Sequence, residues 1–346
     1  MGQSPDSSLY NEEQIGMPFY QGNADFGEIH PKARVWCTKP TKIAKSGDIL
    51  LSVRAPIGAL NIANEDCCIG RGLAAITADS NKCSKKYLWY ALESKKDELI
   101  SKGTGSTFKA ISKNVLFDTE IPYVPLDKQI FIEQTLDKIS QLVNSRKKQL
   151  DLLSNLVASR FIEMFGNPAT NDLHWTYIPL SYCLNSIDNG KSHICDSSTR
   201  QNNFPAILKL SAATYGYYRP EENKAILDDC QYDENISVKP GDLLFTRKNT
   251  PELVGMCAYV YETPCRLMMP DLIFRLNTTP MCNKIFLWKL INHDLFRKQI
   301  QAIASGSAKS MSNISKERLM SLKIILPPLD LQNQFAEFVK QTDKSK

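Results

Sequence analysis

The sequence predicts an α+β protein: two mixed α/β domains, each rich in strands with a terminal helix, separated by long antiparallel helices in a pseudo-twofold tandem repeat. Three observations support this fold class. The chain matches itself at spacings of about 188 to about 203 residues, the size of a duplicated domain. Short apolar runs end at Gly, Pro, Asn or Asp. One long stretch lacks Gly and Pro. We therefore expect domains at 1–125 and 167–327, a spacer helix at 126–166 and a second helix starting within 328–346.

The duplication rests on motifs of matching order. Three of them recur: Lys45–Leu51 as Lys239–Phe245, Tyr87–Trp89 as Phe286–Trp288, and Pro125–Gln129 as Pro328–Gln332. The copies differ widely elsewhere, for example in Gln21–Lys39 compared with Lys209–Asp228. A shared scaffold with different surfaces is what two binding domains for different targets would need.

Each copy contains strand and helix patterns. Ile49–Val53 and Leu73–Ile76 are apolar runs bounded by turn residues and predict strands. Tyr87–Lys102 and its repeat Phe286–Ile303 have helical apolar spacing, so we expect one helix near the end of each copy. The first copy has no counterpart of Asp172–Asp188, from which we expect an opening strand.

The spacer helix is predicted from Asp127 to Phe165, where Gly166-Asn167-Pro168 ends it. About 39 residues at about 1.5 Å each would make a helix near 58 Å long. Apolar residues recur along it by three and four, apart from an interruption at Arg146, which is typical of a helix that packs against another helix. These candidate partner-binding residues are Ile132, Leu136, Ile139, Val143, Leu150, Leu153 and Val157.

Charge is distributed unevenly. The net charge is only +5, yet Lys82–Lys113 holds eight lysines against three acids, and Arg297–Lys323 holds six basic residues against one acid. Either these are solvated helix faces or they attract phosphates. The chain shows no apolar run near the length of a membrane span, and Met1–Asp6 lacks the features of an export signal, so we expect a cytoplasmic protein.

Sequence patterns for catalysis or metal binding are weak. The ten cysteines form no C-x-x-C pair, and the four histidines are scattered, so we expect no metal site. Gly190-Lys191-Ser192 would need a glycine at Asn185 to form a phosphate-binding loop. Pro327-Pro328 lacks the preceding Asn or Asp of adenine methyltransferases. We therefore expect no catalytic site, although an enzyme with unrecognised motifs stays open as an alternative.

Several motifs together resemble a known family. Gly47–Arg54, followed by Ile57-Gly58 and Ile69–Ala74, is similar to the recognition-domain signature of the specificity subunit of type I restriction-modification systems. So are Pro328–Gln332 entering a helix and Phe165–Pro168 ending one. The resemblance covers essentially the whole chain.

The resemblance implies a function and partners. Two target-recognition domains would each read one half of a bipartite site in double-stranded DNA, and paired conserved helices would separate them and dock two methyltransferase (modification) subunits. Those partners would bind S-adenosylmethionine and methylate adenine, while restriction subunits would use ATP and Mg to cleave DNA; this chain would hold no cofactor. A second alternative also stays open, a truncated or silent specificity subunit that acts only as a protein-binding scaffold.

Candidate DNA contacts are the polar and basic residues beside the shared turns, because phosphates are bound by Lys, Arg and Ser, and base edges by Arg, Asn or Gln. For each one, an ordinary surface charge or a fold-stabilising contact is the competing interpretation. The candidates are Gln21, Asn23, Arg54, Arg71, Lys109 and Lys113 in the first copy, and Lys209, Tyr215, Arg219, Arg247, Lys248, Asn249, Lys309 and Lys316 in the second.

Overall fold

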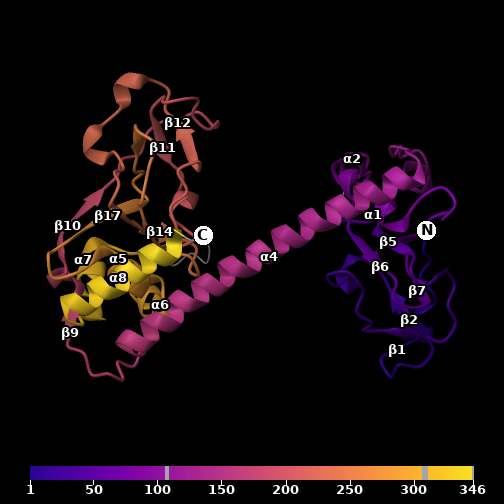
Figure 1. Ribbon diagram of the computed structural model, residues 1–346, viewed down its shortest axis with the longest axis horizontal. Helices are drawn as coiled ribbons and strands as arrows, with labels where there is room; N and C mark the ends of the chain where they lie inside the picture. Colours follow the sequence, from indigo (N-terminus) through magenta and orange to yellow (C-terminus); the bar gives the residue numbers. More distant parts are fainter. Residues whose placement is uncertain (106–108, 306–310, 345–346) are drawn as a thin grey trace. The chain divides into compact units, whose positions relative to one another are not determined.

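The computed structural model describes residues 1–105, 109–305 and 311–344. The chain divides into two compact units, unit 1 (Met1–Arg146) and unit 2 (Lys147–Lys346). Helix α4 (Leu126–Phe165) contributes to both, and it begins one residue before the predicted start and ends where predicted (Figure 1). Gly166 follows it at φ +73°, a conformation that favours glycine. Within the described ranges, no helix is both long and apolar enough to cross a membrane.

Unit 1 is built on two small sheets. One has the order β6-β5-β8, with β5 in the middle, and the other has the order β1-β3-β2-β7-β4. Their bounds are β1 (Tyr10–Asn11), β2 (Met17–Tyr20), β3 (Trp36–Cys37), β4 (Ile43–Ala44), β5 (Ile49–Ser52), β6 (Leu60–Ile62), β7 (Cys67–Ile69) and β8 (Leu73–Ile76), with short 3-10 helices η1 (Ser7–Leu9) and η2 (Asn23–Asp25). Both predicted strands are therefore present.

Strand β5 is buried on both faces, which explains its unbroken apolar sequence. Ile49 and Leu51 pack with Leu92 and Leu99 of the helices, whereas Leu50 packs with Tyr20 and other residues of the second sheet region. Strands β2 and β7 run parallel, and the loops after them emerge at the same edge.

The predicted single helix at Tyr87–Lys102 is wrong, because the structure has two helices: α1 (Lys85–Ser94) and α2 (Lys96–Ser101). The same break occurs in unit 2 between α5 (Lys284–Asn292) and α6 (Asp294–Ala302). His293 lies at that break with ψ 127°, and its side chain accepts the N–H of Leu295 to cap α6. Apolar spacing did not reveal the break, because each new helix returns its own apolar face to the core.

Unit 2 repeats this plan with additional strands. Its sheets have the orders β10-β17-β13-β15, β12-β11-β16, β14-β18 and β19-β9. The strands are β9 (Tyr177–Pro179), β10 (Leu184–Asn189), β11 (Ala206–Leu208), β12 (Asn223–Ala225), β13 (Leu243–Thr246), β14 (Lys248–Asn249), β15 (Cys257–Tyr259), β16 (Leu267–Met268), β17 (Ile273–Thr278), β18 (Ser312–Asn313) and β19 (Lys323–Ile325).

The remaining helices are short except for the last one. They are α3 (Lys113–Phe117), α7 (Lys316–Ser321) and α8 (Leu329–Lys344), with 3-10 turns η3 (Leu180–Tyr182), η4 (Leu210–Ala212), η5 (Asp229–Gln231) and η6 (Glu234–Ile236). The predicted opening strand is confirmed in unit 2, where Asp172–Asp188 contains β9 and most of β10. Strand β13 corresponds to β5, because β13 lies between β15 and β17 as β5 lies between β6 and β8.

The predicted antiparallel helix pair is present in unit 2, where α8 lies beside the C-terminal part of α4 (Figure 1). The ring of Phe335 lies 5.4 Å from those of both Phe161 and Phe165. The Arg160 guanidinium lies over Phe338, one turn further along α8. Later residues of α8 therefore contact earlier residues of α4, so the two helices run antiparallel. The buried aromatic rings join both helices to the core of unit 2.

Candidate nucleic-acid interface

In unit 1, backbone hydrogen bonds bring four loops together. The N–H of Gly72 donates to the carbonyl of Gln21 (3.1 Å), and the N–H of Val53 donates to the carbonyl of Gly72 (2.9 Å). The N–H of Ala55 donates to the carbonyl of Lys109 (3.1 Å). A Cβ at position 72 would lie 2.3 Å from the Gln21 oxygen, so this approach requires glycine.

We call the surface formed by Gln21–Asp25, Arg54–Pro56, Gly70–Gly72 and Lys109 the loop edge of unit 1. Five of the predicted DNA-contact residues lie there. Asn23 is half-buried, and the other four are exposed: Gln21, Arg54, Arg71 and Lys109. Sequence-distant candidates thus gather on one surface. Lys113 is exposed too, and its ammonium lies 5.2 Å from the ring centre of Phe117.

The loop edge of unit 1 contains a hollow of about 730 Å³, lined in part by Gln21, Asn23 and Arg34. Buried Asp25 organises its wall, because its carboxylate accepts the N–H groups of Gln21 (2.7 Å) and Gly22 (3.3 Å). The same carboxylate pairs with the Arg34 guanidinium at 2.5 Å. Sequence reasoning missed Arg34, since nothing local indicates that it lies beside Gln21.

Unit 2 presents the same edge with different side chains. Strand β11 pairs in parallel with β16 at the same register as β2 pairs with β7. Lys209, directly after β11, is therefore equivalent to Gln21, directly after β2. The N–H of Arg247 donates to the carbonyl of Leu272, as the N–H of Val53 donates to that of Gly72. The residues that follow, Lys248 and Arg54, are therefore equivalent.

The charge at one turn is reversed between the copies. The N–H of Leu73 donates to the carbonyl of Gly70 at 3.0 Å, and that of Ile273 donates to Pro270 at 3.1 Å, so the two turns are equivalent. The first turn carries Arg71 and the second carries an aspartate, Asp271, and both side chains are exposed. Sequence reasoning missed Asp271, because an alignment without the turn geometry did not pair it with Arg71.

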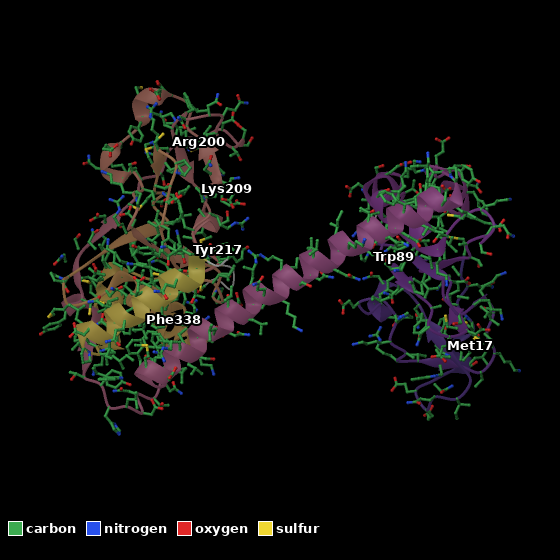
Figure 2. The ribbon with its side chains drawn as sticks, viewed as in Figure 1. Met17, Trp89, Arg200, Lys209, Tyr217 and Phe338 are labelled. Atoms are coloured by element: carbon green, nitrogen blue, oxygen red, sulfur yellow. The ribbon has the colours of Figure 1, made fainter. Side chains whose placement is uncertain are left out.

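A tyrosine loop adjoins the edge of unit 2. Tyr215 and Tyr217 are 52% and 54% exposed on either side of Gly216, which has φ +84°. The carbonyl of Gly216 accepts the indole N–H of Trp288 at 2.8 Å. In Figure 2, the labelled residues Arg200, Lys209 and Tyr217 follow one another along one side of unit 2. Tyr217 was missed, although two tyrosines around a glycine could have indicated an exposed aromatic loop.

The predicted contact residue Arg219 lies in this loop region but is neutralised by acids. Its guanidinium pairs with Glu221 at 3.1 Å and Glu222 at 3.4 Å, and lies 5.9 Å from the Tyr215 ring centre. The hydrogen bond to Glu221 raises the pKa of Arg219. In this structure Arg219 is thus engaged by residues of the loop, and its assignment as a DNA contact stays a prediction.

Three other predicted residues of unit 2 are engaged by the fold itself. Asn249 is 8% exposed and donates from Nδ2 to Thr214 Oγ1 at 3.1 Å. Lys316 is half-buried and donates from Nζ to the carbonyl of Ile187. Arg247 donates to Asn313 Oδ1 at 3.3 Å. These contacts hold the three side chains within unit 2, and their assignment as DNA contacts stays a prediction. Lys309 lies outside the described residues.

The repeated Gly-Asp turns are structural. Asp48 accepts the N–H of Lys45 at 2.8 Å, and Asp242 accepts that of Lys239 at 2.9 Å. Burial raises the pKa of Asp242, against the effect of the Arg275 guanidinium whose Nε lies 3.1 Å away. Among the described residues, no three His, Cys, Asp or Glu side chains are grouped so that they could hold a metal ion.

The apolar seam predicted on the spacer helix is buried unevenly. Val157 lies in the core of unit 2, and four others are half-buried: Ile132, Leu136, Leu150 and Leu153. Ile139 and Val143 are exposed, and so is Leu142, at 70%. The middle of α4 therefore presents an apolar surface that includes a residue outside the predicted seam.

Comparison with known proteins finds a matching family. A family described as the type I restriction modification DNA specificity domain matches residues 1–153 and 185–346. The chain is 44% identical over 149 residues to a protein named as the specificity subunit of the type I restriction enzyme MjaX of Methanocaldococcus jannaschii, covering 43% of this chain and 35% of that protein. It is 28% identical over 178 residues to the EcoEI specificity subunit of Escherichia coli, covering 50% and 30%.

The fold is shared with a solved structure over nearly the whole chain. The S subunit of a type I restriction-modification system from M. genitalium aligns with a TM-score of 0.58 and 15% identity, covering 99% of this chain and 86% of that one. By sequence, the chain matches about a third of the length of these two curated relatives.

Proposed function

Because this chain belongs to the type I restriction-modification DNA specificity family, we propose that it is a non-catalytic recognition subunit whose two units each contact one half of a bipartite, gapped DNA site. One observation carries this proposal. The two copies share a scaffold edge yet present different polar groups there, Arg71 compared with Asp271 and Gln21 compared with Lys209. Two binding sites of unequal specificity need that combination.

The chemistry of the loop edges suits base and phosphate contacts. A guanidinium such as that of Arg71 can bond both acceptors of guanine in the major groove, and an amide such as Gln21 can bond adenine. A carboxylate at Asp271 would repel phosphates but can accept the amino group of cytosine. Arg54 and Lys248 would bind phosphates and so fix the position of each unit on the duplex.

The exposed apolar surface of α4 supports a docking function. Ile139, Leu142 and Val143 lie on a helix whose two ends belong to the two recognition units. A charge-poor apolar patch flanked by polar residues is suited to a protein interface. We infer that two methyltransferase subunits dock along the helices, and that restriction subunits join through them. Binding of S-adenosylmethionine, adenine methylation and ATP hydrolysis belong to those partners in this proposal.

The test is co-expression with the cognate methyltransferase subunit, followed by mapping of adenine methylation in host DNA. We expect a bipartite, gapped motif that disappears when this chain is removed. Charge reversal at Arg71 should alter one half-site only, because the other half is assigned to unit 2. Methylation without any dependence on this chain would overturn the proposal.

The scaffold alternative is distinguished by the same experiment. The exposed surface of α4 would also suit a chain that binds a methyltransferase and reads no DNA. Binding to the partner without a methylation motif, and without salt-dependent binding to duplex DNA, would favour that function. A chain that methylates DNA by itself with S-adenosylmethionine would instead favour the enzyme alternative.

A further inference from the structure

Two fully buried glutamines play no part in the proposed DNA surface. Gln129 and Gln332 are both 0% exposed, although glutamine is usually an exposed residue. Each lies in the first turns of the helix that follows the repeated motif, α4 for Gln129 and α8 for Gln332. Each also ends the repeated Pro-Leu-Asp-x-Gln motif.

In unit 1, the amide of Gln129 joins three segments of the chain. Its Oε1 accepts the N–H of Ser84, at the start of α1, at 2.8 Å. Its Nε2 donates to the carbonyl of Lys82 at 2.9 Å and to that of Val124 at 2.7 Å. The side chain therefore ties α4 to the approach of α1 and to the segment that leads into α4.

In unit 2, Gln332 makes the same three bonds. Its Oε1 accepts the N–H of Asn283 at 2.9 Å. Its Nε2 donates to the carbonyls of Met281 at 3.2 Å and Pro327 at 2.8 Å. All six partners in the two units are backbone groups, so the arrangement persists although the neighbouring side chains differ.

The other contacts at the two helix starts are unequal. In unit 1, Glu133 accepts the Ser84 hydroxyl, and Asp137 accepts the Tyr90 hydroxyl at 2.9 Å and pairs with Lys86. These contacts are polar and partly exposed. In unit 2, α8 also buries Phe335, Ala336 and Val339 in the core. The attachment of α4 to unit 1 thus depends more on Gln129 than the attachment of α8 to unit 2 depends on Gln332.

We propose that Gln129 and Gln332 are positioning residues: they fix the angle between each helix and the segments that precede it, and thereby set how strictly the complex selects the gap between half-sites. This inference rests on the proposed function. A glutamine is required because each site offers one backbone N–H and two backbone carbonyls, and a glutamine amide supplies one acceptor and two donors for them. Loss of the donors would leave two partly buried carbonyl groups without this partner, which favours a repacked helix start.

The test uses Gln129→Glu in the full complex with the methyltransferase subunits. Glutamate keeps the shape and the acceptor for Ser84, but an ionised carboxylate has no donor for the two carbonyls. The control is Gln134→Glu, which adds the same charge at an exposed position of the same helix. Methylation rates are measured on a library in which the mapped half-sites are separated by the native gap or by one or two base pairs more or fewer.

We expect preference for the native gap to fall on the order of tenfold in Gln129→Glu, because the carbonyls of Lys82 and Val124 lose their donors. The bases of each half-site should stay unchanged, and Gln134→Glu should resemble the wild type. Gln332→Glu should lose less gap preference, and Gln334→Glu is its exposed control. If Gln129→Glu fails to assemble, the gap preference of Gln332→Glu tests the inference.

The inference is overturned if the assembling variants lose methylation equally at all gaps, which is the effect of a merely structural residue, or if gap preference is unchanged. Failure of the proposed function would look different, because the wild-type complex itself would then show no gapped motif.

Discussion

The indole N–H of Trp288 donates to the carbonyl oxygen of Gly216 at 2.8 Å and ties helix α5 to the loop that carries Tyr215 and Tyr217. The side-chain amide of Asn292, at the end of α5, lies 3.5 Å from the same oxygen and also bonds the backbone of Cys257. An exposed loop is thus held by a buried helix. In the proposed function, such ordering before binding would reduce the entropy lost on contact between the tyrosines and DNA.

Trp288→Phe should therefore weaken binding to the half-site assigned to unit 2. Phenylalanine retains much of the packing but loses the hydrogen bond, whose net contribution is about 0.5–1.5 kcal/mol. Affinities of the methyltransferase complex for duplexes carrying the mapped site would measure this loss. The matched control is Trp89→Phe, at the repeated position in unit 1. Equal effects of the two variants on the unit 2 half-site would contradict the prediction.

Arg71→Ala should relax selection at one base pair of the half-site assigned to unit 1. Removal of a guanidinium that bonds a base edge costs about 1–3 kcal/mol at that base pair and little elsewhere. Competition between site variants at several salt concentrations gives both the specificity and the salt dependence. Asp271→Ala is the counterpart and should affect only the other half-site. A uniform loss across all sequences with a weaker salt dependence would place Arg71 on a phosphate instead.

Phe161→Ala should destabilise unit 2 by about 3–5 kcal/mol, because a large side chain at the helix junction would leave a cavity. Its ring is fully buried and lies 5.8 Å from that of Phe286 and 5.4 Å from that of Phe335. Urea unfolding followed by circular dichroism measures the change. Leu152→Ala, at an exposed site of the same helix, should change stability by no more than about 0.5 kcal/mol. Similar losses in both variants would contradict this account of the junction.

The stability of unit 2 should fall as the pH drops below about 6.5. Burial lowers the pKa of His293 from its ordinary value of 6.5, so the unfolded chain binds its proton more readily than the folded chain does. The stability linked to neutral His293 is present above pH 6.5 and is lost as the pH falls through the lowered pKa. Unfolding in urea between about pH 7.5 and about pH 5.5 tests this.

His293→Asn is the informative variant for that measurement, because asparagine can still cap α6 but does not titrate. It should lose stability at every pH, since the ring of His293 packs 5.1 Å from that of Phe161. The decrease between the two pH values should nevertheless become smaller. An unchanged pH dependence would assign the effect to other groups.

Removal of residues 141–147 from α4 should shorten the gap between half-sites and leave their bases unchanged. Seven residues are close to two helical turns and about 10 Å, or roughly three base pairs, so the helix faces stay nearly in register. All seven positions are exposed, which limits damage to the units. Two of them, Leu142 and Val143, lie on the proposed docking surface, so binding of the methyltransferase subunits to the variant is measured first. Methylation mapping of the variant reveals the new gap. Altered half-site bases would mean that the units do not act as separate readers.

Much of the architecture followed from the sequence, because its signals are local or repetitive. The motif Lys45–Leu51 and its copy identified the duplication, and the absence of Gly and Pro from Asp127 to Phe165 placed α4 to within one residue. The same motifs supported the family, which the comparisons confirm. The residue types at the candidate sites were also readable, since phosphate and base contacts require few kinds of side chain.

Only the tertiary structure decided which side chains are available. Asn249 and Lys316 carry suitable groups but are turned inward by contacts with Thr214 and Ile187, residues far away in the sequence. Burial of Gln129 likewise depends on Lys82 and Ser84, which no local pattern connects to it. Exposure and hydrogen bonding depend on packing between distant segments, whereas helix formation and repetition depend on neighbours along the chain; the sequence therefore determined the scaffold, and the fold decided which of its residues can meet a partner.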